Sequence, residues 1–490
     1  MLNDKPLSGV RIVEVEGIGP GPFTAMMLAD LGADVIVVHR PRSGPVVGLK
    51  ERPVTDRGKR SLVLDLKSDT DRAVCLDLIA HADGLIEGFR PGVMERLGLG
   101  PDVCLRRNPR LVYGRMTGWG QDGPLANRAG HDLNYIALSG ASWSSALEGE
   151  RPSVPPTLVG DIGGGALYLV AGMLSGIIAA GRTGRGTVVD AAIYDGAAHM
   201  QNLLMSIAGA VEDCASAQAN PLVGAHWSRT YRCADDGFIS VQCLEPKFYA
   251  EFLSRLGLSE DTDFAMHQFD RAAWPRLSAI LSDIFSAQSR SHWENVFDGS
   301  DACVAPVLSP REAFAHPQNA ARQTWHEVDG TLQAAAAPRF GGQPPAPPTE
   351  VRVRGQDTET ILEALSASKG WPGRGDGGEL VRLCRGPLHR HALRRSSSGA
   401  AATRGRSSCS ARPPRAGGGE SARDPDHEHH HRGGGDRRPD RPRRGWPSGY
   451  LGPRRPRPRH LTHSPQRGWR HRLCPVDGRI LRYDDEPPRR

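Results

Sequence analysis

The sequence predicts an α/β fold with a parallel sheet in its first half and a smaller α+β domain behind it. Three observations support this prediction. Short β-branched runs alternate with helical segments up to about residue 190, which is the βαβ pattern of a parallel sheet. Glycine-rich loops follow several of those runs directly. From about residue 226 the pattern turns mainly helical, with one apolar run at 239–244.

The elements of the first half follow from hydrophobic period and from turn residues. Strands are predicted at 10–15, 33–38, 61–66, 84–87, 111–115 and 187–190, and helices at 23–31, 69–81 and 191–211. The stretch 159–174 begins with an acid and three glycines and continues as a helix that is apolar on nearly every side. Such a helix is expected to lie inside a core.

The second half is expected to form a separate unit. Residues 224–232 have the composition of a polar loop, a strand is predicted at 239–244, and helices are predicted at 248–256, 274–285, 292–297 and 358–367. The alanine- and proline-rich stretch 336–349 is expected to return to the first domain as a strap. The predicted organisation is a large, Rossmann-like domain at 1–190 completed by 331–368, a linking helix and loop at 191–225, and a small domain at 226–330.

The C-terminal part of the chain differs sharply in composition. Residues 371–490 contain 28 Arg, no Lys and 12 acidic residues, a charge of about +16, so the first 370 residues carry about −9 of the net +7. No periodic apolar segment is found there, so residues 370–490 are expected to be disordered. A basic arm for nucleic acid is one interpretation. The excess of Arg, Pro, Gly and His favours another, a GC-rich gene read out of frame, which makes a nucleic-acid partner unlikely.

Bulk features favour a cytoplasmic protein without a membrane anchor. The N-terminus lacks a basic-then-apolar signal, and no apolar run reaches the roughly 20 residues of a membrane span without interruption. Nine scattered cysteines without a CxxC pair fit a reducing compartment. The histidine-rich run at 427–431 resembles a metal tract, but no metal site is expected in a tail of this composition.

Three loops that follow predicted strands are candidates for ligand contacts. The loop GIGPGP at 17–22 lacks the third glycine of a dinucleotide fingerprint, because Pro22 stands there. This argues against a nicotinamide cofactor and leaves open that the loop lies near the phosphates of another nucleotide. Arg90 comes just after the strand at 84–87, where α/β sheets bind ligands, although a surface turn would look the same. The loop at 116–124 combines glycines with Trp119, which suits a pocket wall.

Two side chains are candidates for acid–base chemistry. His131 stands at the start of a predicted helix, where the helix dipole disfavours the imidazolium and leaves a neutral base. Asp161 opens the glycine-started helix, where backbone amides can keep a partly buried carboxylate ionised. The simpler interpretations are a structural histidine and a helix N-cap. Glu245 follows the strand of the second domain and is a third candidate, since ligand sites often lie between domains.

Eight motifs in the same order make residues 5–368 resemble the class III coenzyme A transferase superfamily, also called the carnitine dehydratase and bile-acid-inducible protein F type. The motifs are PLSGVRIVE at 6–14, GIGPGP at 17–22, ADLGADV at 29–35, GFRPGV at 88–93, MTGWGQ at 116–121, GHDLNY at 130–135, GDIGGG at 160–165 and VDAA at 189–192. The residues His131 and Trp119 make the chain similar to the α-methylacyl-CoA racemases of this superfamily rather than to its transferases.

The resemblance implies a racemase that interconverts (R)- and (S)-2-methylacyl-CoA through an enolate. His131 and Asp161 would flank the α-carbon, one removing a proton and the other returning one. Asp132 would support them, and Gly163, Gly164 and the helix amides would stabilise the enolate oxygen. No cofactor or metal is implied, because coenzyme A is part of the substrate. The alternative within the superfamily is a CoA-transferase in which Asp161 is the nucleophile.

The resemblance also implies a coenzyme A site and an interlocked homodimer. The expected contacts to coenzyme A are Arg90, Ile18, Arg40, Leu64 and Tyr135. Family members usually carry a basic residue where this chain has Val37 and an acidic one where it has His39, so Arg40 is expected to substitute for the missing cation. In the implied dimer, Glu245 of one subunit pairs with His131 of the other.

Overall fold

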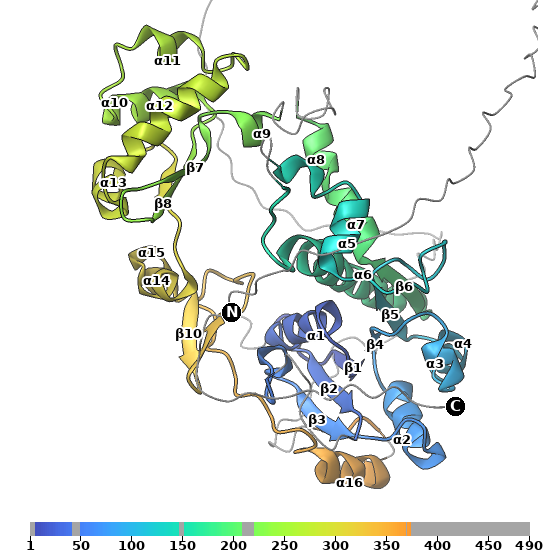
Figure 1. Ribbon diagram of the computed structural model, residues 1–490. Coiled ribbons are helices and arrows are strands. Elements are labelled where there is room, and N and C mark those ends of the chain that lie inside the picture. The colour runs from blue at the N-terminus through green and yellow to red at the C-terminus, as the bar shows by residue number, and fades with distance from the viewer. Residues whose placement is uncertain (1–4, 42–49, 147–150, 208–219, 369, 374–490) are drawn as a thin grey trace, which may run out of the picture. The chain divides into compact units, whose positions relative to one another are not determined.

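The computed structural model describes residues 5–41, 50–146, 151–207, 220–368 and 370–373. Its main feature is a six-stranded parallel sheet with the strand order β3-β2-β1-β4-β5-β6 (Figure 1). The strands are β1 (Arg11–Val15), β2 (Asp34–His39), β3 (Arg60–Val63), β4 (Gly84–Glu87), β5 (Val112–Thr117) and β6 (Thr187–Ala192). This order confirms the predicted Rossmann-like sheet, in which the direction of strand addition reverses between β1 and β4.

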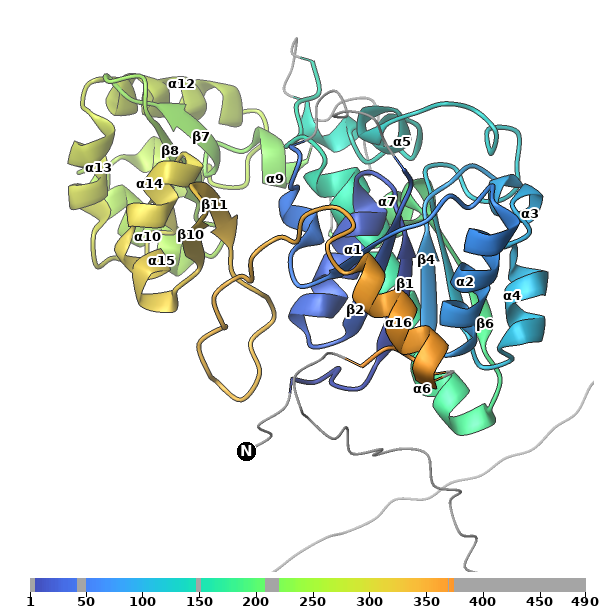
Figure 2. The ribbon, with the colours of Figure 1, turned by 90° about the horizontal axis from the view of Figure 1, so that it is seen from below.

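Helices cover both faces of this sheet, because successive side chains of each strand point to opposite faces. The helices are α1 (Pro20–Asp30), α2 (Asp69–Ala80), α3 (Val93–Arg96), α4 (Pro101–Arg107), α5 (Asp132–Leu138), α6 (Leu167–Thr183), α7 (Ile193–Met200), α8 (Asn202–Met205) and α16 (Thr358–Ser368), with 3₁₀ turns at Val54–Asp56 and Trp143–Ser145. Ile12 lies in the cluster with α1 and α6, whereas Val13 lies in the cluster with α2 and α16. The helix α16 packs against β3 and α2, and Figure 2 shows it on the same side of the sheet as α2.

The predicted elements of this part are correct in type and differ at their ends by a few residues. The largest error is the helix predicted at 191–211. Strand β6 extends to Ala192, and the helix is divided into α7 and α8, whereas residues 208–219 lie outside the described part. The short helices α3 and α4 were not predicted, because each is too short to display a helical period.

The glycine-rich stretch does not start an ordinary helix at Asp161. A π-helical segment, η3, runs from Leu158 to Ala166 and continues directly into α6. Asp161 is therefore inside the first turns, and Thr157 is the N-cap residue. The expected burial is also wrong, because Ile178 is 59% exposed and only 39% of the most apolar window of Leu158–Thr183 is buried. By length and composition alone this continuous helix could cross a membrane, but α1, β5 and β6 pack against it.

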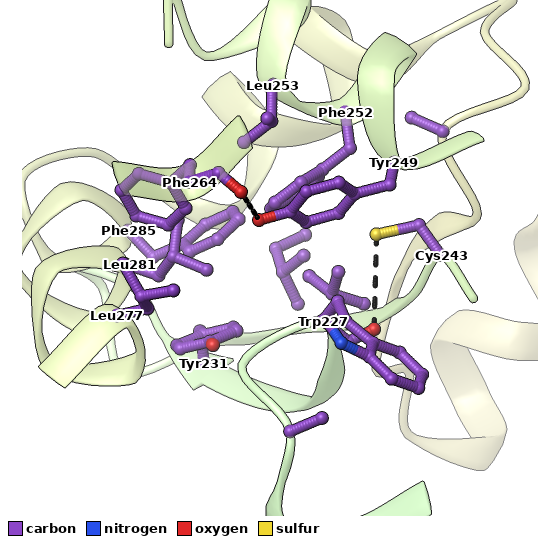
Figure 3. Close-up of a cluster of buried hydrophobic side chains, with 14 of the residues drawn as sticks. Trp227, Tyr231, Cys243, Tyr249, Phe252, Leu253, Phe264, Leu277, Leu281 and Phe285 are labelled. Carbon is purple, nitrogen blue, oxygen red and sulfur yellow. Dashed lines mark hydrogen bonds between the residues drawn. The ribbon is translucent and has the colours of Figure 1, made fainter. Parts of the chain in front are cut away.

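Residues 225–302 form a hydrophobic core of their own. It lies between a three-stranded antiparallel sheet and four helices: β7 (Ser228–Arg232), β8 (Phe238–Gln242), β9 (Val304–Pro306), α10 (Pro246–Arg255), α11 (Thr262–Met266), α12 (Trp274–Ser286) and α13 (Arg290–Phe297), with α9 (Pro221–Gly224) preceding them. Tyr231 and Phe285 stack with ring centroids 5.0 Å apart. Figure 3 shows the buried cluster to which both rings belong. The polar loop predicted at 224–232 is wrong, because Trp227 and Tyr231 are buried and the segment includes β7.

Two short helices, α14 (Pro310–Ala315) and α15 (Pro317–Arg322), follow in the chain. After them the strands β10 (Trp325–Val328) and β11 (Thr331–Ala334) form an antiparallel hairpin. The buried guanidinium of Arg57 donates to the carbonyl of Ala334 at 2.8 Å and pairs with Asp30 at 2.6 Å. These contacts tie the end of the hairpin to α1. The domain boundaries themselves stay a prediction.

The first residues of the predicted disordered tail are ordered. Trp371 is buried, and its indole N–H donates to Asp34 Oδ2 at 2.8 Å. Arg60 pairs with the same carboxylate at 2.7 Å and also donates to the carbonyl of Pro372. The prediction of disorder is therefore wrong for 370–373. Residues 374–490 lie outside the described part.

A buried ion pair lies beneath the loop that follows β1. Lys59 and Glu14 are almost fully buried, and Lys59 Nζ donates to Glu14 Oε2 at 2.5 Å and to the carbonyl of Pro22 at 3.1 Å. Burial raises the pKa of Glu14 to about 7, although Lys59 opposes this shift. Because Pro22 lies in the first turn of α1, the pair fixes the beginning of that helix against the sheet.

Candidate active site

The site is organised around the first residue of α5. His131 is the N-cap residue of this helix, with an extended backbone and an exposed side chain. The backbone N–H of His131 donates to Asn134 Oδ1 at 3.0 Å, which fixes the peptide that enters the helix. Asp132 is the next residue and is buried. The prediction that His131 stands at the start of a helix is therefore confirmed.

Asp132 connects α5 to the π-helical segment. Its Oδ1 accepts the backbone N–H of Asp161 at 2.9 Å, and its other oxygen, Oδ2, is buried without a partner among the described residues. Since Asp132 follows His131 directly, this hydrogen bond brings His131 and Asp161 to one place, although they are thirty positions apart in the chain. π-Helical turns are rare and often occur at functional sites.

The carboxyl group of Asp161 is electrostatically unusual. Its pKa is raised to about 6, chiefly by burial and also by the charge of the neighbouring Asp132, while His131 opposes this shift. The interaction with His131 shows that the two candidate side chains are close enough to influence each other. A carboxyl group with a pKa near neutrality can both accept and release a proton in the cell. Its Oδ2 lies 3.8 Å from the position that a Cβ on Gly19 would occupy, so the glycine loop after β1 borders it.

Two aromatic rings form a wall beside these residues. Trp119 and Tyr135 meet edge to face with centroids 4.7 Å apart, and the Tyr135 hydroxyl donates to the carbonyl of Gly130. A Cβ on Gly118 would lie 2.1 Å from the Tyr135 ring, so only glycine permits this contact. Trp119 Nε1 is buried and has no partner among the described residues. The predicted role of the Trp119 loop as a pocket wall stays a prediction.

Arg90 lies in the loop after β4 and interacts electrostatically with Tyr135. Burial and the charge of Asp161 raise the pKa of Tyr135, whereas Arg90 lowers it. Tyr135 therefore lies within electrostatic range of both. The strand order reverses between β1 and β4, so the loops carrying Gly19 and Arg90 flank the position where α/β sheets of this type bind ligands.

The other predicted coenzyme A contacts lie in different surroundings. Ile18 is 64% exposed in the loop after β1, and Arg40 is exposed at the end of β2. The peptide of Arg40 is fixed, because its N–H donates to Glu16 and its carbonyl accepts from Arg354. Leu64, in contrast, is only 3% exposed and belongs to the core. Val37 is buried inside the sheet between β1 and β3, so Arg40 is the exposed cation nearest to it along β2.

The glycines of the π-helical segment are required for packing. A Cβ on Gly164 would lie 2.6 Å from the backbone nitrogen of Ala197 and 2.8 Å from the carbonyl oxygen of Ile193. Gly163 is less crowded, because a Cβ there would lie 3.2 Å from the carbonyl oxygen of Leu158 and 3.2 Å from the end of the Met200 side chain. Close approach of α7 to η3 therefore accounts for these glycines, whereas their predicted role in stabilising an enolate oxygen stays a prediction.

Glu245 has a different local environment. It is exposed and is the N-cap residue of α10. Its charge raises the pKa of the neighbouring Cys303 thiol, for which burial is the main cause. No contact between Glu245 and His131 or Asp161 is found within the described residues. The predicted pairing of Glu245 with His131 across a dimer stays a prediction.

Three charged residues at the strand ends were not singled out from the sequence. Glu87 and Arg115 are buried at neighbouring positions of β4 and β5, and Asp190 lies beside Arg115 on β6. They hold the loops that carry Arg90 and Trp119. The available signal was a charged residue inside a strand that otherwise reads as buried. In the described part of the chain no cluster of three metal-binding side chains is found.

With this geometry, the chain can be compared with known proteins. The model of CoA-transferase family III matches residues 7–358, and the chain therefore belongs to this family. The Homo sapiens protein "Alpha-methylacyl-CoA racemase" is 38% identical over 374 residues, covering 74% of this chain and 94% of the relative. The Acetobacter aceti protein "Acetyl-CoA:oxalate CoA-transferase" is 31% identical, covering 69% of this chain and 90% of the relative.

Solved structures agree with the fold. A CaiB/BaiF family protein from Brucella suis superimposes with a TM-score of 0.62 at 26% identity, covering 74% of this chain and all of that protein (100%). Family and relatives together identify an enzyme of CoA thioester chemistry. The relatives include both racemases and CoA-transferases, so the likeness alone does not distinguish these two reactions.

The packing of η3 on α7 gives a first prediction. Gly164→Ala inserts a methyl group against the α7 backbone and should cost about 1–3 kcal/mol of stability by overpacking, with loss of activity because Asp161 lies in the same segment. Gly181→Ala in α6, where a Cβ meets nothing within 4 Å, is the matched control and should be neutral or slightly stabilising. Thermal unfolding and activity of both variants test this; equal melting temperatures would contradict the packing argument.

Proposed function

We propose that this protein is a racemase that interconverts (R)- and (S)-2-methylacyl-CoA thioesters. The observation that carries the proposal is the hydrogen bond between Asp132 and the Asp161 amide, which holds His131 and Asp161 at one site. Racemisation needs two groups, each able to take and to give a proton, at opposite faces of one carbon. An imidazole and a carboxyl group with a pKa of about 6 have this capacity.

The chemistry balances within the site without a cofactor. One of the two groups takes the α-proton, and the electrons of the broken C–H bond move into the thioester to give an enolate. The other group then delivers a proton to the opposite face of the α-carbon. The first backbone N–H groups of α5 and of η3 are candidate donors to the enolate oxygen; a donor of this kind typically contributes about 10²–10³-fold in rate.

Removal of the carboxyl group tests the role of Asp161. Asp161→Ala should lower α-proton exchange by at least about 10²-fold, the lower range for a general acid–base catalyst. The assay incubates (R)-2-methylacyl-CoA in deuterated water and follows α-deuterium incorporation together with loss of optical purity. Asp102→Ala, on the exposed side of α4, is the control and should exchange normally. Exchange by Asp161→Ala near the wild-type rate would refute the assignment.

The raised pKa of Asp161 leads to a pH prediction. Because its ionised form is the base, kcat/KM in the direction in which Asp161 removes the proton should fall about tenfold per pH unit below pH 6. Asp132→Asn removes a negative charge that raises the pKa of Asp161, so the acid limb should move to lower pH. A pH–rate profile measured in each direction tests both statements. An acid limb that does not move in Asp132→Asn would contradict the proposed electrostatic coupling.

The second candidate is a CoA-transferase with Asp161 as nucleophile, which the transferases among the relatives favour. In that reaction the carboxylate attacks the thioester carbonyl, CoA thiolate leaves, and an aspartyl anhydride forms. Hydroxylamine or borohydride would trap such covalent intermediates. Racemisation without a second carboxylic acid, and without a trapped adduct, would favour the racemase.

The proposal includes a homodimer in which Glu245 of one subunit pairs with His131 of the other and orients its ring. Its support is the apolar surface of α6 and α8, where Ile178 is 59% and Leu203 is 71% exposed. Exposed apolar side chains of this size mark protein–protein contacts where they gather on one surface.

Disruption of that surface tests the dimer. Ile178→Glu should give a monomer in sedimentation experiments and abolish exchange, because a charge opposes burial in the interface. Met266→Glu, which changes an apolar residue of α11 that is 77% exposed, is the control and should leave the dimer intact. Full exchange activity in a monomeric Ile178→Glu variant would exclude a contribution of the second subunit.

A further inference from the structure

A row of three charged side chains crosses the carboxyl end of the parallel sheet. Glu87, Arg115 and Asp190 occupy neighbouring positions on β4, β5 and β6 in the parallel register. Glu87 is 1% and Arg115 is 7% exposed. Burial raises the pKa of Glu87 to about 7, so placing this carboxyl group here is costly for the fold. Core packing does not explain this row, because apolar side chains of similar volume would fill the same space with equal or greater stability.

The guanidinium of Arg115 joins two carboxylates on either side of one loop. Its Nε donates to Glu87 Oε1 at 3.0 Å, and its Nη1 and Nη2 donate to Glu95 Oε1 and Oε2 at 2.9 and 3.4 Å. Glu87 ends β4, and Glu95 lies in α3. Arg90 stands in the loop between them, so both ends of its loop are attached to a single side chain.

The loop is also held from within. Oε2 of Glu87 accepts the backbone N–H of Phe89 at 2.7 Å, which fixes the peptide next to Arg90. On the other side of the row, Asp190 Oδ2 accepts the N–H of Gln121 at 3.0 Å and so holds the loop that carries Trp119. The planar fork of arginine suits this task, since lysine could not donate to two carboxylates in fixed directions.

We propose that Arg115 is a positioning residue for coenzyme A recognition: by clamping Glu87 and Glu95 it sets the loop at 88–92 so that Arg90 meets the phosphates of the bound thioester. This rests on the proposed function, in which Arg90 contacts coenzyme A. Arg115 itself touches neither the phosphates nor the reacting carbon. Its loss therefore acts on the binding of the nucleotide part and leaves proton transfer unaffected once the substrate is saturating.

The experiment measures the Kd of free coenzyme A by calorimetry, and KM and kcat of α-exchange for two substrates. One is the acyl-CoA, and the other is the acyl-pantetheine thioester, which lacks the nucleotide. Arg90→Gln and Arg115→Gln should each raise Kd and the acyl-CoA KM roughly 10- to 100-fold, the range for a lost charged hydrogen bond. Values of kcat, and KM for acyl-pantetheine, should stay within about twofold of wild type.

Two variants guard against misfolding, and one serves as a control. Glu95→Gln removes only the outer, partly exposed arm and Arg115→Lys keeps the charge, so both should fold and raise Kd less than Arg115→Gln. Arg107→Gln breaks an exposed pair with Asp77 on the surface and should leave Kd unchanged. The double variant Arg90→Gln/Arg115→Gln should bind no more weakly than Arg90→Gln, because the clamp acts through Arg90.

The outcomes separate the clamp from the function on which it rests. If Arg90→Gln weakens binding and the folded Arg115 and Glu95 variants do not, the clamp proposal is overturned and the coenzyme A site stands. Additive effects in the double variant, or equal losses for acyl-pantetheine, also overturn it, because they indicate a general structural role. If Arg90→Gln binds coenzyme A normally, the clamp falls together with the assigned phosphate contact.

Discussion

The site depends on one partly buried hydrogen bond, from the Asp161 amide to the Asp132 carboxylate. It joins the start of α5 to a π-helical turn that an ordinary helix could not provide with the same spacing. The negative charge of the Asp132 carboxylate also acts on the Asp161 carboxyl group and helps to raise the pKa of Asp161. The contact thus sets the position of the carboxyl group that we propose as catalytic, and burial is the main cause of its raised pKa.

Buried charged groups lie beneath the loops that surround this contact and hold those loops in place. Lys59 and Glu14 fix the start of α1 next to Gly19, and Arg115 joins the two ends of the Arg90 loop. Both devices consist of buried ions, which cost stability unless they are paired well. Their position at the carboxyl edge of the sheet, where the strand order reverses, indicates that this cost is accepted for the geometry of a binding site.

Much of the fold could be predicted, and the errors have physical causes. The β-branched runs predicted all six parallel strands, since a strand buried on both faces has a continuous apolar signature. Strand β7 was missed because Ser228 and Arg229 hide the alternation that buries Trp227 and Tyr231. Burial of α6 was overestimated, because an apolar composition does not reveal which neighbour covers each face. Trp371 is ordered by contacts with Asp34 and Arg60 that lie over 300 residues away.

By itself, the sequence determined the strand pattern, the glycine loops and the candidate residues His131 and Asp161, since these depend on local composition and on motif order. Only the tertiary structure decided that Asp132 joins them, that η3 is π-helical, and that Gly164 serves the contact with α7. It alone brought Glu87, Arg115 and Glu95 together. The reason is that such contacts join residues far apart in the chain, and no local pattern encodes the distance between them.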